Sequence, residues 1–175
     1  MTNLDINFEK GVRLLAEYFP VSKNDTRKSI LFHDIRVGNY LYERDYNKDI
    51  VLAALLHDSV EWSDITLEMI MDKFNKNIAD LVDANTKNRT LPKAEQNEDM
   101  IKRCVKYSEE ALIVKAVDIL DSYRLYTKKN NKEQLINHCL QMSQLLFKYK
   151  PSDYKDAIFE KLKKEEQKVH SLLVS

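Results

Sequence analysis

The sequence predicts an all-α protein, a compact single-domain helical bundle. Only 2 Gly and 3 Pro occur in 175 residues, which leaves few breaks for a strand-and-turn architecture. Apolar residues recur three or four apart along most of the chain, which is the spacing of one face of a helix. The 43% share of hydrophobic residues is enough for one sizeable core. We therefore expect one domain over residues 1–175.

The first half of the chain predicts five helices in order. A stripe of apolar residues three or four apart indicates a first helix that ends near Pro20. A second helix is expected from about Thr26 to Tyr42. The run DIVLAALLHDSVEW (Asp49–Trp62) is apolar nearly all round, which predicts a central buried helix. Shorter helices should follow at Thr66–Phe74 and around Ile78–Val82.

The second half begins with a polar, basic segment, NTKNRTLPK (Asn85–Lys93), which is the predicted long loop. Loops of this kind on a rigid scaffold often carry functional residues. Beyond it, periodicity predicts four more helices, at about Ala94–Tyr107, Glu110–Thr127, Glu133–Tyr149 and Ser152–Val174.

Charge and targeting signals narrow the classes of partner. Lys+Arg and Asp+Glu both number 28, and a formal charge of zero removes the long-range attraction to nucleic acid or acidic membranes. No stretch approaches the ~18 apolar residues of a membrane span, and the N-terminus lacks the features of a signal peptide. We expect a cytoplasmic protein with no nucleic-acid or membrane partner. The Lys-Glu-rich tail FEKLKKEEQKVH predicts a solvated helix face, or a partner helix in a homodimer.

The pair His57-Asp58 inside the apolar run is the most informative feature. An Asp is almost never fully buried unless it is paired or coordinated. A carboxylate and a neutral imidazole are good ligands for a divalent ion, which would offset the cost of burying them. Adjacent helical residues point about 100° apart, so other helices are needed to complete such a site.

Two further helices offer ligands of the same kind. His33 lies upstream in HDIRV, and Asp118 lies downstream in VKAVDIL. Taken singly, His33 could be a core histidine, and Asp118 could accept a hydrogen bond or pair with Arg36. Together the pattern predicts a divalent metal held by His33, His57, Asp58 and Asp118. This ligand set would accept Mn, Fe, Co, Ni or Zn.

A His, then a His-Asp pair, then a distant Asp resembles the ordered pattern of the HD-domain superfamily of metal-dependent phosphohydrolases. Within it, the sequence is similar to the alarmone (guanosine tetra- and pentaphosphate) hydrolases of the RelA/SpoT type. The similarity covers roughly Ile30 to Arg124, and its stretches are AALLHDSVEWSDIT, FNKNIADLVDANTK, RTLPK and LIVKAVDILDSYR. The resemblance implies a helical bundle of the HD-domain type and a divalent ion, Mn²⁺ before others, with Mg²⁺ also compatible.

The resemblance also implies catalytic roles. In the alarmone hydrolases the position of Glu61 carries one acid of a catalytic Glu-Asp pair, and Glu61 shares a helix face with His57. Glu61 is therefore the candidate for positioning or deprotonating the attacking water. Asp64 matches a further acid of the family's HDxxEDxD stretch, or caps the next helix. The alternative for Glu61 is a surface ion pair or a helix-end acid.

Substrate contacts follow from the same comparison. Arg27-Lys28 is what remains of the basic N-terminal segment that grips the nucleotide in those enzymes. Ser122 stands where the family has an Asn near the nucleotide sugar, and Lys115 and Arg124 flank Asp118. The candidate substrate-binding residues are Arg27, Lys28, Lys115, Ser122 and Arg124.

Two departures from the family pattern bear on the activity. Trp62 replaces the second acid of the Glu-Asp pair, and Ile119 replaces the Lys that usually follows the distant Asp. The predicted function is hydrolysis of a nucleotide-like phosphoester or pyrophosphate, with guanosine 3′,5′-bis(diphosphate) 3′-pyrophosphohydrolase as the specific form. The alternatives are a general HD-type nucleotidase or dNTP hydrolase, and a non-catalytic nucleotide- or metal-binding module, which Trp62 favours.

Overall fold

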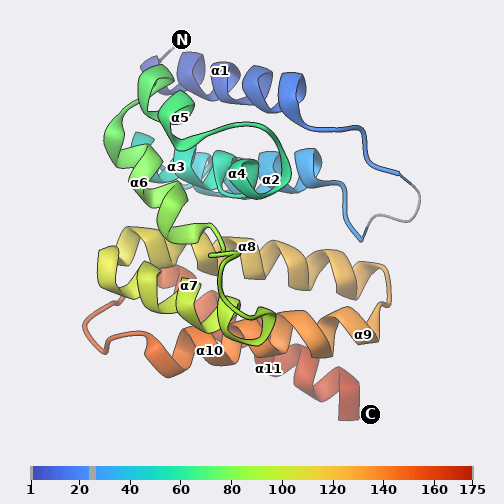
Figure 1. Ribbon diagram of the computed structural model, residues 1–175. Coiled ribbons are helices and arrows are strands. Elements are labelled where there is room, and N and C mark those ends of the chain that lie inside the picture. The colour runs from blue at the N-terminus through green and yellow to red at the C-terminus, as the bar shows by residue number, and fades with distance from the viewer. Residues whose placement is uncertain (1, 24–26, 175) are drawn as a thin grey trace. The chain divides into compact units, whose positions relative to one another are not determined.

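A computed structural model describes residues 2–23 and 27–174 of the chain. Within these residues every regular element is a helix and there is no strand, so the predicted all-α class is confirmed (Figure 1). The chain divides into two compact units, unit 1 up to Lys87 and unit 2 from Asn88 onward. The expectation of one domain over the whole chain stays a prediction.

Unit 1 is built around a central apolar helix, α3. Every residue of α3 from Ile50 to Leu56 is buried. Helices α1, α2 and α6 pack against α3, and α5 packs against α6. The bounds are α1 (Asn3–Tyr18), α2 (Ile30–Tyr42), α3 (Lys48–Leu56), α4 (Ser59–Trp62), α5 (Leu67–Lys73) and α6 (Lys76–Asn85).

Short polar side chains cap the N-termini of several of these helices. Asn47, Thr66 and Asn75 each accept a hydrogen bond from the backbone N–H three residues on, at the starts of α3, α5 and α6. Thr66, not Asp64, therefore caps α5. The predicted start of the second helix, Thr26, lies outside the described residues, and α2 begins at Ile30.

The expectation of one continuous helix over Asp49–Trp62 is wrong. Helix α3 ends at Leu56, and α4 begins at Ser59. His57 Nδ1 lies 2.8 Å from the carbonyl oxygen of Ala54, and Ser59 Oγ donates to the carbonyl of Leu56 over 2.6 Å. These side chains bond to carbonyls at the end of α3 and compete with the helical backbone pattern. The break places the His-Asp pair at a helix end.

A glycine brings α2 against α3. A Cβ added at Gly38 would lie 2.8 Å from Leu55 Cβ and 3.0 Å from Leu55 Cα, closer than side chains can approach. Only a residue without a side chain allows this contact. Because the two helices form a hairpin, the close approach at Gly38 also brings the first turn of α2 beside the end of α3. His33 and His57 occupy those two places.

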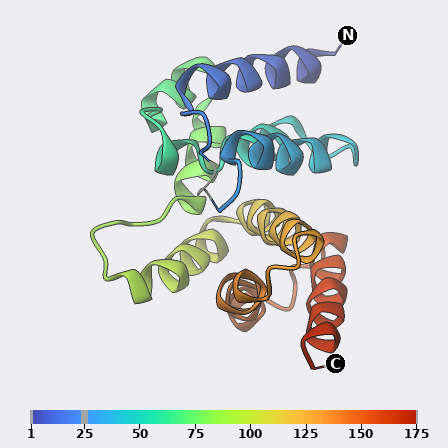
Figure 2. The same ribbon diagram turned by 90° about the vertical axis from the view of Figure 1, so that its right-hand side faces the viewer.

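Unit 2 is centred on α8, a long helix whose residues are mostly buried. Helices α7, α10 and α11 pack against it, and Figure 2 shows α7 and α11 on opposite sides of α8. The bounds are α7 (Lys93–Tyr107), α8 (Glu109–Lys128), α9 (Lys132–Gln134), a π-helical stretch η1 (Leu135–Leu140), α10 (Gln141–Tyr149) and α11 (Ala157–Val174).

Two predictions for unit 2 need correction. The helix expected over Glu133–Tyr149 is interrupted by the wider turns of η1. The last helix begins at Ala157 rather than Ser152, because Asp156 accepts the N–H of Ile158 over 2.8 Å and turns the chain into the helix there. The predicted loop between α6 and α7 is confirmed.

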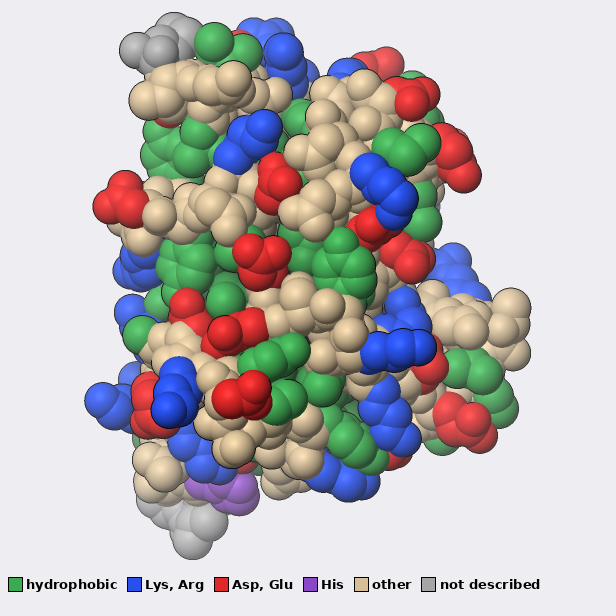
Figure 3. Space-filling model, turned by 90° about the vertical axis from the view of Figure 1, so that its left-hand side faces the viewer, with side chains coloured by type: hydrophobic (Ala, Val, Ile, Leu, Met, Phe, Trp, Pro, Cys, Tyr) green, Lys and Arg blue, Asp and Glu red, His purple; other side chains and the backbone are tan. Residues whose placement is uncertain are grey.

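The surface is mixed in charge. On the face drawn in Figure 3, acidic and basic side chains are interspersed, as the equal numbers of the two kinds lead one to expect. In the described part of the chain no helix combines the length and hydropathy that crossing a membrane requires.

Candidate metal centre

Four acidic and imidazole side chains of unit 1 converge between α2 and the end of α3. One ligand atom each from His33, Asp34, His57 and Asp58 lies within 4.8 Å of all the others. His33, Asp34 and His57 are fully buried, and the Asp58 side chain is 13% exposed. The three predicted ligands of unit 1 are therefore brought together, and Asp34 joins them.

The hydrogen bond of His57 fixes which ring nitrogen faces the cluster. A carbonyl oxygen only accepts, so the Nδ1 of His57, 2.8 Å from the Ala54 carbonyl, must carry the proton and donate it. In the neutral ring, Nε2 then keeps its lone pair, and it lies 3.7 Å from Asp58 Oδ1. Metal-binding histidines are typically oriented in this way by a carbonyl acceptor.

The other members lie around the His57 ring. The Nε2 of His33 lies 3.9 Å from Asp58 Oδ2, and the two imidazole rings have centroids 5.2 Å apart with planes inclined by 70°. Asp34 Oδ1 lies 3.9 Å from His57 Nδ1. Asp34 thus approaches the proton-bearing side of His57, while Asp58 approaches the lone-pair side.

The donor set fits a divalent ion. Separations of 3.7 and 3.9 Å are too long for direct hydrogen bonds. Ligand atoms that share an ion at about 2.0–2.2 Å each stand roughly 3–4 Å apart. Neutral imidazoles and ionised carboxylates, buried together, are also the chemical types that bind such ions. The cluster therefore suits a divalent metal.

Lys28 places a positive charge beside this cluster. Its side chain is only 6% exposed, and its Nζ lies 3.7 Å from Asp58 Oδ2. The neighbouring Arg27 is exposed. Of the two predicted substrate contacts in this segment, Lys28 is therefore placed at the centre, where its charge partly offsets the carboxylates.

The two predicted catalytic acids differ in their surroundings. Glu61 is 8% exposed, and its carboxylate accepts the backbone N–H of Lys87 over 2.8 Å, with Lys87 Nζ at 3.4 Å. Glu61 thus ties α4 to the residues after α6. Asp64 is exposed and lines a shallow hollow with Val60 and neighbouring residues up to Glu68.

The remaining predicted residues belong to unit 2. Asp118 is 8% exposed, and its Oδ2 lies 3.0 Å from Lys115 Nζ, one turn earlier in α8. Ser122 is buried one turn later on the same helix, and Arg124 is exposed. Asp118 thus forms an ion pair with Lys115 of its own helix. The role of Asp118 as a ligand stays a prediction.

Asp34 is the residue that sequence reasoning missed. A signal was present, because the dipeptide His-Asp occurs twice, at His33-Asp34 and at His57-Asp58. Only the second pair lies in a run that is apolar on all sides. The burial of Asp34 depends on the approach of α2 to α3, which periodicity does not specify.

Comparison with known proteins agrees with this geometry. A family model described as the HD domain matches residues 12–112, which include three of the four predicted ligands and end before Asp118. Solved structures share the fold, and two examples follow. A metazoan SpoT orthologue that hydrolyses ppGpp has a TM-score of 0.74 at 21% identity, covering 93% of this chain and 95% of that one. The protein lmo0812 of Listeria monocytogenes EGD-e has a TM-score of 0.67 at 20% identity, covering 79% and 99%.

Curated relatives point the same way. A guanosine-3′,5′-bis(diphosphate) 3′-pyrophosphohydrolase of Aquifex aeolicus is 30% identical over 73% of this chain and 19% of its own length. The human pyrophosphohydrolase MESH1 is 36% identical over 53% of this chain and 52% of its own length. The chain thus spans about half or less of these curated relatives. Because the family match covers more than half of the chain, the chain belongs to the HD domain family.

Proposed function

We propose that this chain is a metal-dependent phosphohydrolase acting on a nucleotide-like phosphoester or pyrophosphate. The observation that carries the proposal is the set of His33, Asp34, His57 and Asp58, whose ligand atoms lie within 4.8 Å of one another. The specific activity that we propose is 3′-pyrophosphohydrolysis of guanosine 3′,5′-bis(diphosphate), since relatives in Aquifex aeolicus and human carry that name.

In this proposal His33, His57 and Asp58 hold the ion, and Mn²⁺ is the ion proposed from the family resemblance. A divalent ion there would supply Lewis-acid chemistry, activating water and stabilising charge on phosphate oxygens. The Ala54 carbonyl keeps the His57 ring in the tautomer that presents Nε2. Asp34, near the opposite nitrogen, helps to hold the same ring or serves as a further ligand. Asp118 as the fourth ligand remains a prediction from the sequence.

Glu61 is the proposed acid-base residue. It follows the cluster by one helical turn, its side chain is largely buried, and a carboxylate positioned in this way is a common general acid or base. Its hydrogen bond from the Lys87 backbone orients the carboxylate. Asp64 remains a second candidate, and its exposure favours a lesser role.

Positive side chains are proposed to bind the substrate. Lys28 lies 3.7 Å from Asp58 Oδ2, so a phosphate bound at the cluster would lie within reach of its ammonium group. Arg27 is proposed to contact a more distant phosphate. Lys115, Ser122 and Arg124 stay sequence-based candidates, as do a homodimer and a cytoplasmic location.

The test is a substrate panel. Purified protein, loaded in turn with Mn, Mg, Co or Ni, is incubated with guanosine tetraphosphate, deoxynucleoside triphosphates and nucleoside monophosphates, and the products are separated by chromatography. Release of pyrophosphate from guanosine tetraphosphate with Mn²⁺ is the expected result. Turnover of none of these compounds with any metal would contradict the enzyme proposal.

One observation favours a different function. Trp62 occupies the place of the second acid in the family pattern, and its side chain is 45% exposed beside the cluster. A module that binds a nucleotide without hydrolysing it needs a binding surface. It does not need a catalytic acid such as Glu61. Tight nucleotide binding in a metal-replete sample without turnover would identify that module. Turnover of deoxynucleotides in place of guanosine tetraphosphate would identify a general HD-type nucleotidase.

A further inference from the structure

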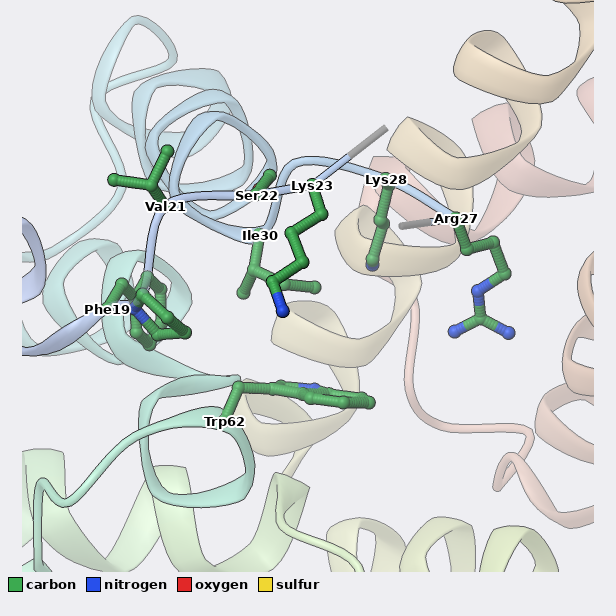
Figure 4. Close-up of a pocket in the computed structure, with 9 residues that line it drawn as sticks. Phe19, Val21, Ser22, Lys23, Arg27, Lys28, Ile30 and Trp62 are labelled. Carbon is green, nitrogen blue, oxygen red and sulfur yellow. The ribbon is translucent and has the colours of Figure 1, made fainter. Parts of the chain in front are cut away.

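Unit 1 contains a hollow next to the candidate metal centre, with a volume of about 430 Å³. This volume lies within the range of small-molecule sites. Figure 4 shows the hollow with the Trp62 ring along one side and Ile30 and Lys23 facing it from the other. Its lining residues are Phe19, Pro20, Val21, Ser22, Lys23, Arg27, Lys28, Ile30 and Trp62.

Trp62 gives this hollow a flat aromatic wall. It is the last residue of α4, and 45% of its side chain is exposed although large aromatic rings usually bury more. Phe19 and Ile30 add apolar surface. An exposed indole face in a concave, apolar setting suits a planar aromatic group, which can stack on it.

Positive charge lines the same hollow. Lys23, Arg27 and Lys28 are all lining residues, and among the lining residues that the structure describes none is acidic. Cations of this kind favour phosphate groups. A hollow with an aromatic wall and a basic side is therefore complementary to a molecule that joins a flat ring to phosphate, which is the chemistry of a nucleotide.

One residue connects the hollow to the metal centre. Lys28 lines the hollow, and its Nζ is 3.7 Å from Asp58 Oδ2. Trp62 is also tied to the same aspartate, because its backbone N–H donates to the Asp58 carbonyl over 3.1 Å. Residues four apart on a helix lie on the same side. A phosphate bound at the centre and a ring bound in the hollow could thus belong to one molecule.

We propose that this hollow binds the nucleobase of a phosphorylated nucleotide and that Trp62 is its stacking platform. Trp62 is then a substrate-selecting residue that stands where the family pattern has an acid. Lys28 contacts the phosphate nearest the base. The inference rests on the proposed function for its role in catalysis, but the binding itself is measurable without turnover.

The chain has a single Trp, so its fluorescence reports on Trp62 alone. Metal-free protein is titrated with guanosine diphosphate, with ribose 5-phosphate and with pyrophosphate, and is excited at the red edge of the indole absorption. A base stacked on the indole should quench the emission, so guanosine diphosphate should quench and the two base-free compounds should not. Equal responses to all three, or no response to any, would overturn the proposal.

Three variants sharpen the test by calorimetric titration with guanosine diphosphate. Trp62→Ala should weaken binding roughly 5- to 150-fold, which corresponds to the loss of one stacking contact. Trp62→Phe should retain most of the affinity. Tyr107→Ala removes another aromatic residue, 41% exposed at the end of α7, and should leave the affinity unchanged. Loss of affinity in Tyr107→Ala equal to that in Trp62→Ala, or none in Trp62→Ala, would refute the assignment.

The two proposals fail in different ways. Quenching by guanosine diphosphate without hydrolysis of any nucleotide would support the base pocket and end the claim of enzymatic function. Hydrolysis of base-free phosphoesters as fast as nucleotides, without quenching, would keep the hydrolase and remove the pocket.

Discussion

Each unit contains buried carboxylates, but the two units neutralise them differently. In unit 2, Asp118 sits within the continuous helix α8, 3.0 Å from the ammonium of Lys115 one turn away. In unit 1, Asp34 and Asp58 lie with two imidazoles at the break between α3 and α4. There the ion pair with Lys28 is longer, at 3.7 Å.

This difference indicates what each region is built for. A buried carboxylate beside a lysine on its own helix is largely compensated in charge before any ligand arrives. Two carboxylates that share a site with two imidazoles are instead the kind of donor set that a divalent cation binds. The comparison therefore favours unit 1 as the part of the chain that organises the metal.

The largest expected effect comes from removing the oriented imidazole of unit 1. His57→Ala should abolish metal retention and lower hydrolysis by more than about 100-fold, because a ligand matters at least as much as the groups that orient it. Metal content by plasma mass spectrometry and turnover of guanosine tetraphosphate measure the two effects. His170→Ala, an exposed histidine of α11, is the control and should behave as the wild type.

A somewhat smaller loss of activity is expected from Glu61. Glu61→Gln should lower kcat by roughly 100-fold while the metal content stays unchanged, as removal of an acid-base group does. Lys87→Ala removes the ammonium group 3.4 Å from Glu61 and keeps the backbone N–H that orients the carboxylate, so it should retain most of the activity. Equal losses of kcat in both variants would show that the ion pair with Lys87, and not proton transfer by Glu61, carries the effect.

Breaking the ion pair between Lys115 and Asp118 in unit 2 should lower the free energy of unfolding. Lys115→Met leaves Asp118 buried without its lysine and should cost about 3 kcal/mol of unfolding free energy. Because we predict Asp118 as a ligand, saturating Mn²⁺ should recover part of this loss. Denaturant melts with and without Mn²⁺ measure both effects, and an equal loss in the two conditions would count against Asp118 as a ligand.

The smallest effect tests the packing that brings the imidazoles together. Gly38→Ala forces α2 away from the backbone of α3 and should cost about 1–3 kcal/mol, together with weaker metal binding. Gly11→Ala is the matched control, because its Cβ would meet the movable Leu55 Cδ2 rather than backbone. If Gly11→Ala weakens metal binding as much as Gly38→Ala does, the close approach of α2 to α3 is not what sets the geometry.

Much of the fold followed from periodicity, and the exceptions have local causes. The positions of α1, α7 and α8 agree with their apolar stripes to within a few residues. The break at His57-Asp58 was not predicted, because apolar character alone does not show a side chain replacing a backbone hydrogen bond. Similarly, the π-helical turns of η1 leave no mark in the spacing of apolar residues.

The candidate site was predicted in part for a related reason. Residue chemistry identified His33, His57 and Asp58, because imidazole and carboxylate groups in apolar helices require a partner. Asp34 and the wall formed by Trp62 depend on how α2, α4 and the chain before Ile30 pack in three dimensions. The packing of these elements against one another cannot be inferred from the spacing of residues in a single sequence.

The most direct test of the account is the position of the bound ion. Crystals of the Mn²⁺-loaded protein, measured for anomalous scattering of manganese, should show one peak at about 2.0–2.3 Å from His33, His57 and Asp58. The same map would show whether Asp34 or Asp118 completes the ligands. A peak elsewhere, or none in a metal-loaded crystal, would contradict the assignment of unit 1 as the metal centre.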